Sequence, residues 1–378
     1  MHNDQKTWIE ISRSALTHNV KAFRCHLGSS VAVMAIVKSN AYGHGLVPTA
    51  KIADRAGASW FGVDNVDEGI ALRKHGIKKP ILLLGYTLND RLREAITNDL
   101  SLIIYNLETA RSLERLRLTG RRGSVARVHI KIETGTTRQG IKGDDLSRLA
   151  RRLKKIPGVV IEGASTHYAN IEDTTDASYA KSQLRRFEEE ITLLHREGID
   201  PPFLHTACSA AAILFPKTHF NLARIGISMY GLWPSKETQK EGGIVLTPAL
   251  AWKTIIAQIK TVPKGASVSY GLTERTTRAS TLAILPIGYW DGYDRGLSSI
   301  GHVLIRGHIC KIIGRVCMNM CVVDVTDLPH VHVEDEVVLL GRQGAEEISA
   351  QDIASKLGTI HYEVVTRINP TVTRKVVQ

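Results

Sequence analysis

Cysteine and aromatic residues are scarce in this 378-residue chain, and each shortage excludes a class of protein. The five cysteines are an odd number and no two show C-x-x-C spacing, so neither a disulfide framework nor a zinc site is favoured. No stretch approaches the ~18 consecutive apolar residues that a membrane helix needs. The first residues, MHNDQKTW, lack the apolar stretch of a secretory signal. We therefore expect a cytoplasmic protein with no membrane partner and no bound metal.

Positive charge is in excess, with 49 Lys and Arg residues against 37 Asp and Glu residues, a net charge of +12. Nucleic-acid-binding proteins usually concentrate such charge with aromatic residues on one face. Here the basic runs are short and aromatic residues make up only 6% of the chain. We therefore expect a solvated basic surface that attracts anionic metabolites, and no nucleic-acid partner.

Eight short apolar, β-branched runs alternate with segments of helical period in the first 235 residues. The runs begin at Val31, Trp60, Pro80, Leu100, Ala126, Val159, Phe203 and Leu222. Strands buried on both faces give such continuous runs, and eight β/α units in ~235 residues match the usual (β/α)8 barrel. A doubly wound sheet would show a glycine fingerprint after its first strand, but KSNAYGHGLVP has Pro48 in place of the third glycine. The sequence predicts an α/β fold with a (β/α)8 barrel over residues 1–235.

The pattern changes after Pro234. The polar segment PSKETQKEGG indicates a linker, and later runs such as STLAILPIGY and CMNMCVVDVT alternate with turns and contain few helical patterns. We expect residues 236–378 to form a smaller, mainly β domain.

Polar residues stand at or near the carboxyl ends of the predicted barrel strands, where barrel enzymes carry their chemistry. They are Lys38, Tyr42, Lys131, Arg138, His167, Ser209 and Arg224, and Gly226 follows Arg224. Each has an ordinary explanation when taken alone, such as a solvated strand end for a lysine or a satisfied core residue for a histidine. Lys38 differs because the apolar run MAIV precedes it and small residues surround it. Desolvation favours an uncharged lysine amine, which is the condition for a Schiff-base lysine.

The sequence resembles the alanine racemase family over nearly its whole length. The resemblance rests on AIVKSNAYGHG at residues 35–45, followed in order by KIETGTTRQG, THYAN, ACSAA, ARIGISMYG, VSYGLT, LPIGYWDG and GRVCMNMC. It implies a barrel that binds pyridoxal 5'-phosphate, a β domain, a homodimer, and the interconversion of L- and D-alanine. That activity would supply D-alanine for peptidoglycan.

The resemblance also implies two bases. Lys38 would hold the cofactor covalently and act on one face of the substrate α-carbon. Tyr270, contributed by the partner subunit, would act on the opposite face. Racemisation needs groups on both faces, because a single base tends to return the proton to the face it came from.

Further roles follow for residues that match the family motifs. His167 and Arg224 are implied to adjust the tyrosine and the cofactor, with Arg224 on the pyridine nitrogen. The implied phosphate contacts are Tyr42, Ser209, Gly226 and Ile227. The implied substrate contacts are Arg138, Met318 and Tyr289. Lys131 matches a lysine that is carbamylated in many members.

Two positions depart from the family pattern. Asn319 stands where many members have aspartate, and Pro370 stands where some members place a tyrosine. A serine or broad-specificity racemase of the same fold is therefore the nearest alternative. A non-catalytic pyridoxal-phosphate carrier is a further alternative, but its single-barrel versions lack the β domain.

Overall fold

The computed structural model describes residues 5–121, 124–172 and 175–378, which form two compact units. The first unit contains residues 14–41 and 46–248. The second contains the described residues before Ser14, residues 42–45 and residues 249–378.

The first unit is built on eight parallel strands in the order β8-β7-β6-β5-β4-β3-β2-β9. They are β2 (Ala32–Ile36), β3 (Trp60–Val63), β4 (Ile81–Leu83), β5 (Ser101–Ile104), β6 (Ala126–Lys131), β7 (Val159–Ser165), β8 (Phe203–His205) and β9 (Leu222–Ile225). The two end strands meet through a hydrogen bond from the Arg224 N–H to the Ala207 carbonyl, 3.0 Å, which closes the sheet. These strands confirm the predicted barrel.

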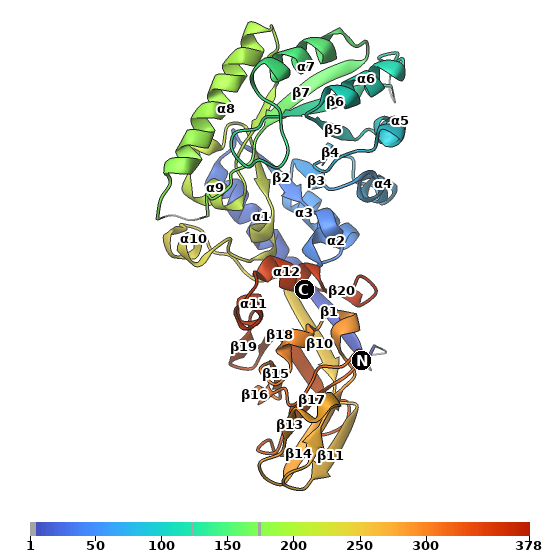
Figure 1. Ribbon diagram of the computed structural model, residues 1–378, viewed down its shortest axis with the longest axis vertical. Helices are drawn as coiled ribbons and strands as arrows, with labels where there is room; N and C mark the ends of the chain where they lie inside the picture. The colour runs from blue at the N-terminus through green and yellow to red at the C-terminus, as the bar shows by residue number, and fades with distance from the viewer. Residues whose placement is uncertain (1–4, 122–123, 173–174) are drawn as a thin grey trace. The chain divides into compact units, whose positions relative to one another are not determined.

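Helices connect the strands and lie outside them; Figure 1 shows α4 to α8 following one another around the barrel. They are α1 (Arg13–Leu27), α3 (Leu46–Ala56), α4 (Val66–Lys74), α5 (Leu92–Thr97), α6 (Leu107–Arg115), α7 (Gly143–Lys155), α8 (Ser178–Arg196) and α9 (Ser209–Leu214). In α7, buried Leu146, Leu149 and Leu153 recur every three or four residues and form the apolar stripe that packs on the sheet. No helix among the described residues is long and apolar enough to cross a bilayer.

The expected linker at Pro234–Gly243 is instead partly helical. Residues Lys236–Glu241 form α10, and the Ser235 hydroxyl accepts a hydrogen bond from the Thr238 N–H at 3.0 Å. Serine is a favoured N-cap because its oxygen satisfies a backbone donor of the first turn. This helix belongs to the first unit, which extends to residue 248 and not to 235.

The second unit is mainly β, as predicted. Its largest sheet has the order β16-β15-β18-β10-β1-β20, with β19 paired to β18, and a three-stranded sheet has the order β11-β14-β17. The strands of these sheets are β1 (Thr7–Ser12), β10 (Leu250–Ile255), β11 (Gln258–Val262), β14 (Ser280–Leu285), β15 (His302–Ile305), β16 (His308–Lys311), β17 (Cys321–Asp324), β18 (Glu336–Gln343), β19 (Glu346–Ile348) and β20 (Thr373–Val377). A short hairpin of β12 (Ser267–Val268) and β13 (Glu274–Arg275) and the helices α11 (Ala350–Leu357) and α12 (His361–Thr366) complete it.

The first strand, β1, lies within residues 1–235 but belongs to the second unit. Strand β1 pairs antiparallel with β10, where Ile9 faces Trp252, and parallel with β20, where Ile9 faces Arg374. Ile9 and Ile11 are fully buried, so this strand gains its apolar contacts from the second unit.

Candidate active site

Polar side chains of the first unit lie at or near the carboxyl ends of its strands. Lys38 follows β2, Lys131 is the last residue of β6, and His167 comes two residues after β7. Ser209 begins α9 after β8, and Arg224 lies in β9. The carboxyl ends of barrel strands converge on one face, so five distant segments of the chain contribute to one site.

Arg224 is the most extensively bonded of these residues. One terminal nitrogen donates to the His205 carbonyl at 2.6 Å and contacts the His205 Nδ1 at 3.0 Å. The other donates to the carbonyls of Thr166 and Thr206 at 2.9 Å and contacts the His167 Nδ1 at 3.1 Å. Arg224 is 6% exposed, and no ion pair with a carboxylate is found for it among the described residues. The guanidinium is therefore fixed in position by neutral acceptors.

Burial and mutual repulsion favour uncharged side chains around Arg224. The pKa of His167 lies well below its ordinary value, because of burial first and then because of the positive charges of Arg224, Lys131, Arg138 and Lys38. The pKa of Lys131 is also well below its ordinary value, because of burial and then of Arg224 and Arg138. Burial lowers the pKa of Arg224 itself to about 10. The mouth of the barrel thus holds a neutral histidine beside several basic groups, an arrangement suited to an anionic ligand.

A pair of buried serines lies beside this cluster. The Ser209 hydroxyl accepts the N–H of Gly226 at 3.0 Å and that of Ser228 at 3.5 Å. The Ser228 hydroxyl is buried and has no hydrogen-bond partner within the described residues. A buried hydroxyl without a partner costs free energy, and a ligand oxygen would satisfy it. The neighbouring Ile227 is 1% exposed, which limits access of water.

The segment after Lys38 has an uncommon backbone. Ser39, Asn40, Ala41 and Tyr42 have φ values of 55°, 53°, 54° and 52°, a left-handed turn of residues that are not glycine. Such a turn costs roughly 1–2 kcal/mol per residue. Hydrogen bonds offset this cost: the Asn40 N–H donates to the Glu68 carboxylate at 3.2 Å, and the Asn40 side chain accepts the N–H of Leu46 at 2.9 Å.

Two predicted residues of the same loops are less buried than the cluster around Arg224. Arg138 is exposed, in the loop between β6 and α7. Tyr42 packs with the second unit, and its ring centroid lies 6.3 Å from that of Tyr362.

The predicted residues of the second unit lie on neighbouring segments. The N–H of Tyr289 donates to the Cys317 carbonyl at 3.0 Å, and the next N–H donates to the Met318 carbonyl at 3.0 Å. The Ser269 hydroxyl donates to the Arg315 carbonyl at 2.7 Å, which ties the turn that carries Tyr270 to the same segment. Tyr270 is 74% exposed.

Sequence reasoning missed several residues that support the site, among them Asn40, Glu68, His205 and Ser228. Asparagine is the commonest residue after glycine in left-handed conformations, so Asn40 carried a weak signal. Glu68 and Ser228 act through backbone contacts or by burial, and neither belongs to a recognisable pattern.

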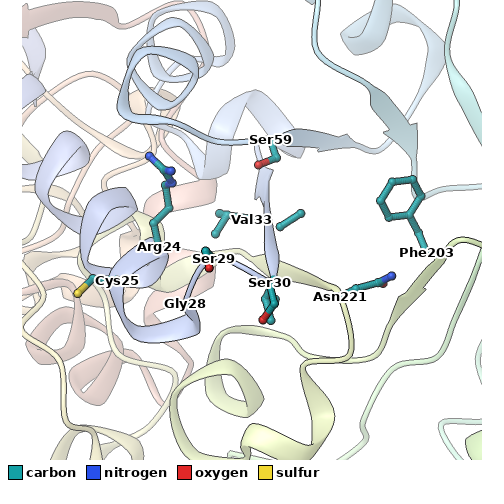
Figure 2. A pocket seen from close by; sticks show the side chains of 11 residues that line it. Arg24, Cys25, Gly28, Ser29, Ser30, Val33, Ser59, Phe203 and Asn221 are labelled. Atoms are coloured by element: carbon teal, nitrogen blue, oxygen red, sulfur yellow. The ribbon is translucent and has the colours of Figure 1, made fainter.

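A separate pocket lies elsewhere, at the amino ends of the barrel strands. It has a volume of about 610 Å³, and Figure 2 shows its lining side chains, which include Arg24, Ser59, Phe203 and Asn221. Phe203 begins β8, and Ser59 and Asn221 immediately precede β3 and β9. None of the predicted site residues lines it. This end of a barrel typically serves stability, so the pocket is not the candidate active site.

Known proteins resemble the whole chain. The family model "Alanine racemase, N-terminal domain" matches residues 11–234, and "Alanine racemase, C-terminal domain" matches residues 249–376. The alanine racemase of Symbiobacterium thermophilum is 41% identical, with 97% of this chain and 96% of the relative covered. The alanine racemase of Halothermothrix orenii is 42% identical, with 98% and 96% covered.

Solved structures agree. The crystal structure of alanine racemase from Bacillus anthracis with bound L-Ala-P has a TM-score of 0.94 and 38% identity, with 100% of this chain and 96% of the other covered. The complex of the Clostridium difficile 630 alanine racemase with cycloserine has a TM-score of 0.91 and 32% identity, with 99% and 96% covered. Full-length identity well above 30% and two matching domain models leave one conclusion: this chain belongs to the alanine racemase family.

Proposed function

We propose that this protein is a pyridoxal-phosphate-dependent alanine racemase, which interconverts L- and D-alanine and supplies D-alanine for peptidoglycan. The observation that carries the proposal is the buried Arg224, held between two imidazoles at the carboxyl ends of strands that also present Lys38. The relatives named above bear the same activity in their names.

The side chains present fit this cofactor. The Ser209 and Ser228 hydroxyls offer partners for phosphate oxygens, together with the backbone of Gly226 and Ile227 and the Tyr42 hydroxyl. The basic cluster favours a dianionic group. The terminal nitrogens of Arg224 contact protein acceptors, which leaves its Nε–H for the ring nitrogen, and an arginine donates a hydrogen bond there without giving up its proton. When bound, the cofactor takes up the electron pair that remains as the α-proton leaves.

Two side chains, Lys38 and Tyr270, then carry out the proton transfers. The Lys38 amine holds the cofactor and accepts or returns the α-proton on one face. On the other face, the Tyr270 side chain accepts the proton as a phenolate and returns it as a hydroxyl. Because the His167 Nδ1 accepts from Arg224, its hydrogen lies on Nε2, where it can donate to a neighbouring hydroxyl. Arg138, Tyr289 and the backbone of Met318 orient the substrate.

Exposed apolar side chains support a homodimer in which Tyr270 serves the partner's site. The second unit exposes Tyr270, Leu272, Tyr289, Trp290, Met318 and Met320, between 43% and 74% each. Apolar side chains gathered on segments tied by backbone hydrogen bonds are typical of a surface that another chain covers.

The test is chiral analysis of the purified protein incubated with pyridoxal phosphate and L-alanine, L-serine or L-lysine. We expect D-alanine to form fastest, at a kcat/KM within the ordinary enzyme range of about 10⁴–10⁸ M⁻¹s⁻¹. Faster formation of D-serine would overturn the assignment to alanine and point to Asn319 or Pro370. No D-amino acid from any substrate would overturn the racemase itself.

Lys131 is expected to be carbamylated. Its lowered pKa increases the fraction of uncharged amine, which attacks carbon dioxide to form an N–C bond and releases one proton. The resulting carbamate would be an anion beside the positive charges of Arg224 and Arg138. We expect a carbamate carbon signal by ¹³C NMR in labelled bicarbonate, and a Lys131→Met variant with activity lowered about 10- to 100-fold. Lys51→Met, on the exposed side of α3, is the control; a wild-type spectrum without the signal would refute the modification.

A further inference from the structure

A line of polar side chains runs inside the barrel from Arg224 to a carboxylate. The Arg224 guanidinium contacts the His205 Nδ1 at 3.0 Å, and the His205 Nε2 lies 2.9 Å from the His129 Nδ1. The His129 Nε2 lies 3.3 Å from the Glu162 carboxylate, which also accepts the Ser101 hydroxyl at 2.7 Å. Both histidines have no exposed surface. Barrel interiors are usually filled by branched aliphatic side chains, so the presence of these polar side chains inside the barrel calls for a functional explanation.

The direction of every hydrogen bond in this line is fixed by its two ends. An arginine can only donate, so the His205 Nδ1 must accept and its hydrogen lies on Nε2. That hydrogen is donated to the His129 Nδ1, which leaves the His129 hydrogen on Nε2, facing Glu162. An ionised carboxylate can only accept. The line is therefore Arg224 to His205 to His129 to Glu162, with a positive charge at one end and a negative charge at the other.

The charges at each point agree with this direction. Burial lowers the pKa of His129 and lowers that of His205 well below its ordinary value, so both rings are neutral. Burial acts to raise the pKa of Glu162, but hydrogen bonds from His129 and Ser101 outweigh it and the pKa is lowered. Glu162 is therefore ionised.

The backbone of β7 is shaped to bring Glu162 to His129. In the pairing of β6 with β7, Val128 faces Ile161 whereas His129 faces Gly163, so Glu162 is an extra residue in its strand. Bulges of this kind redirect a side chain. The next residue is necessarily small, because a Cβ on Gly163 would lie 2.1 Å from the His129 Nδ1.

Aromatic rings pack against His129, in the middle of this line. The Trp60 ring stands edge-on to the His129 ring with centroids 5.4 Å apart, and it meets the Phe203 ring at 5.0 Å. These rings keep water away from the imidazoles. Because the dielectric constant is low there, a charge at one end of the line interacts more strongly with a charge at the other end than it would in water.

We propose that Glu162 is the remote counter-charge of Arg224, and that His129 and His205, in the fixed tautomers above, transmit its charge and hold the arginine in one donor orientation. Glu162 is then a positioning residue for the cofactor contact of Arg224, and this consequence rests on the proposed function. The titratable groups around the guanidinium are His167, Lys131, Arg138, Cys208 and Tyr168, none of them a carboxylate before any modification, so Glu162 would act together with the carbamate expected on Lys131. Glu162 itself is faced by His129, Ser101 and Arg127, and Arg127 also pairs with Asp99.

Neutron diffraction from deuterated crystals of the holoenzyme tests the tautomers without any variant. We expect deuterium on Nε2 and none on Nδ1 in both His129 and His205, and none on Glu162. Deuterium on the Nδ1 of either ring, or on the carboxylate, would overturn the proposal, whatever the enzyme's activity.

Glu162→Gln tests the charge, because the amide oxygen can still accept from His129 while the negative charge is gone. Glu189→Gln, on the exposed face of α8, is the matched control with the same change in net charge. We expect Glu162→Gln to lower kcat about 10-fold with KM changed less than about twofold, since the effect is on the reacting complex. Loss of a negative charge destabilises the Arg224 cation, so the alkaline limb of the pH profile should move to lower pH by about one unit.

A second readout is the absorbance spectrum of the bound cofactor across pH, which should shift in the same direction as the rate. A rate, spectrum and pH profile equal to those of Glu189→Gln would overturn the role of Glu162. An inactive wild-type protein would instead show that the proposed function had failed, while the neutron result would still judge the line itself. If Glu162→Gln does not fold, Ser101→Ala removes one of the carboxylate's hydrogen bonds and should move the alkaline limb by a smaller amount in the opposite direction, because a more basic carboxylate attracts the His129 hydrogen more strongly.

Discussion

Tyr270→Phe is expected to lower racemisation of alanine by about 10²- to 10⁴-fold in both directions, the usual contribution of a positioned acid or base. The variant removes one hydroxyl from a side chain that is 74% exposed in the chain described here. A change at so exposed a position costs little stability, so an unchanged melting temperature should accompany the loss of activity. The measurement is the initial rate from L-alanine and from D-alanine.

The same variant distinguishes a two-base mechanism from a one-base mechanism. If Lys38 works alone on one face, exchange of the α-hydrogen in deuterium oxide should persist for one enantiomer of alanine and be lost for the other. Equal exchange of both enantiomers in Tyr270→Phe, or full racemisation, would show that another group serves the second face. The nearby Tyr289 would then be the first residue to examine, since its segment is bonded to the one that carries Met318.

The barrel could be predicted from local sequence because its strands are short, apolar and regularly followed by helical segments. All eight predicted runs correspond to strands of the sheet. Strand β1 carries a similar apolar pattern but pairs with β10 and β20, which lie more than 230 residues later in the chain. A local sequence pattern predicts that a strand forms. It does not predict which strands pair with it, because those strands can lie far away in the sequence.

The candidate site likewise contains some residues that the sequence predicts and others that it does not. Lys38, His167 and Arg224 stand in recognisable blocks at strand ends, so their positions could be expected. Glu162 could not, because the bulge that places it depends on the register between β6 and β7. A charged residue inside an apolar strand was the available signal: it needs a partner, and the partner here is a histidine on the neighbouring strand.

The left-handed turn after Lys38 shows a further limit. Four successive non-glycine residues at positive φ run against their intrinsic preferences, and no propensity argument would predict them. The turn persists because Glu68 and the Asn40 side chain satisfy its backbone donors and those of its neighbours. Strain of this kind is typical of functional sites, where surrounding structure over-determines the backbone.

Lys38→Ala is expected to abolish racemisation, by at least about 10⁴-fold, because it removes both the covalent attachment of the cofactor and one of the two bases. Lys38→Arg should do the same, since a guanidinium keeps the positive charge but does not form the covalent bond. Lys51→Ala on α3 is the matched control and should retain full activity. The rate of D-alanine formation measures all three.

Attachment can be followed without turnover, which separates the role of Lys38 from that of Tyr270. Borohydride reduction of the loaded wild-type protein and of Tyr270→Phe should leave the cofactor on the peptide that contains Lys38, and Lys38→Ala should carry none. Label on any other lysine peptide of the wild type would remove Lys38 from its role. The turn of Ser39 to Tyr42 favours Lys38 in this role, because backbone strain of this kind is concentrated at functional sites and the turn fixes the backbone immediately after Lys38.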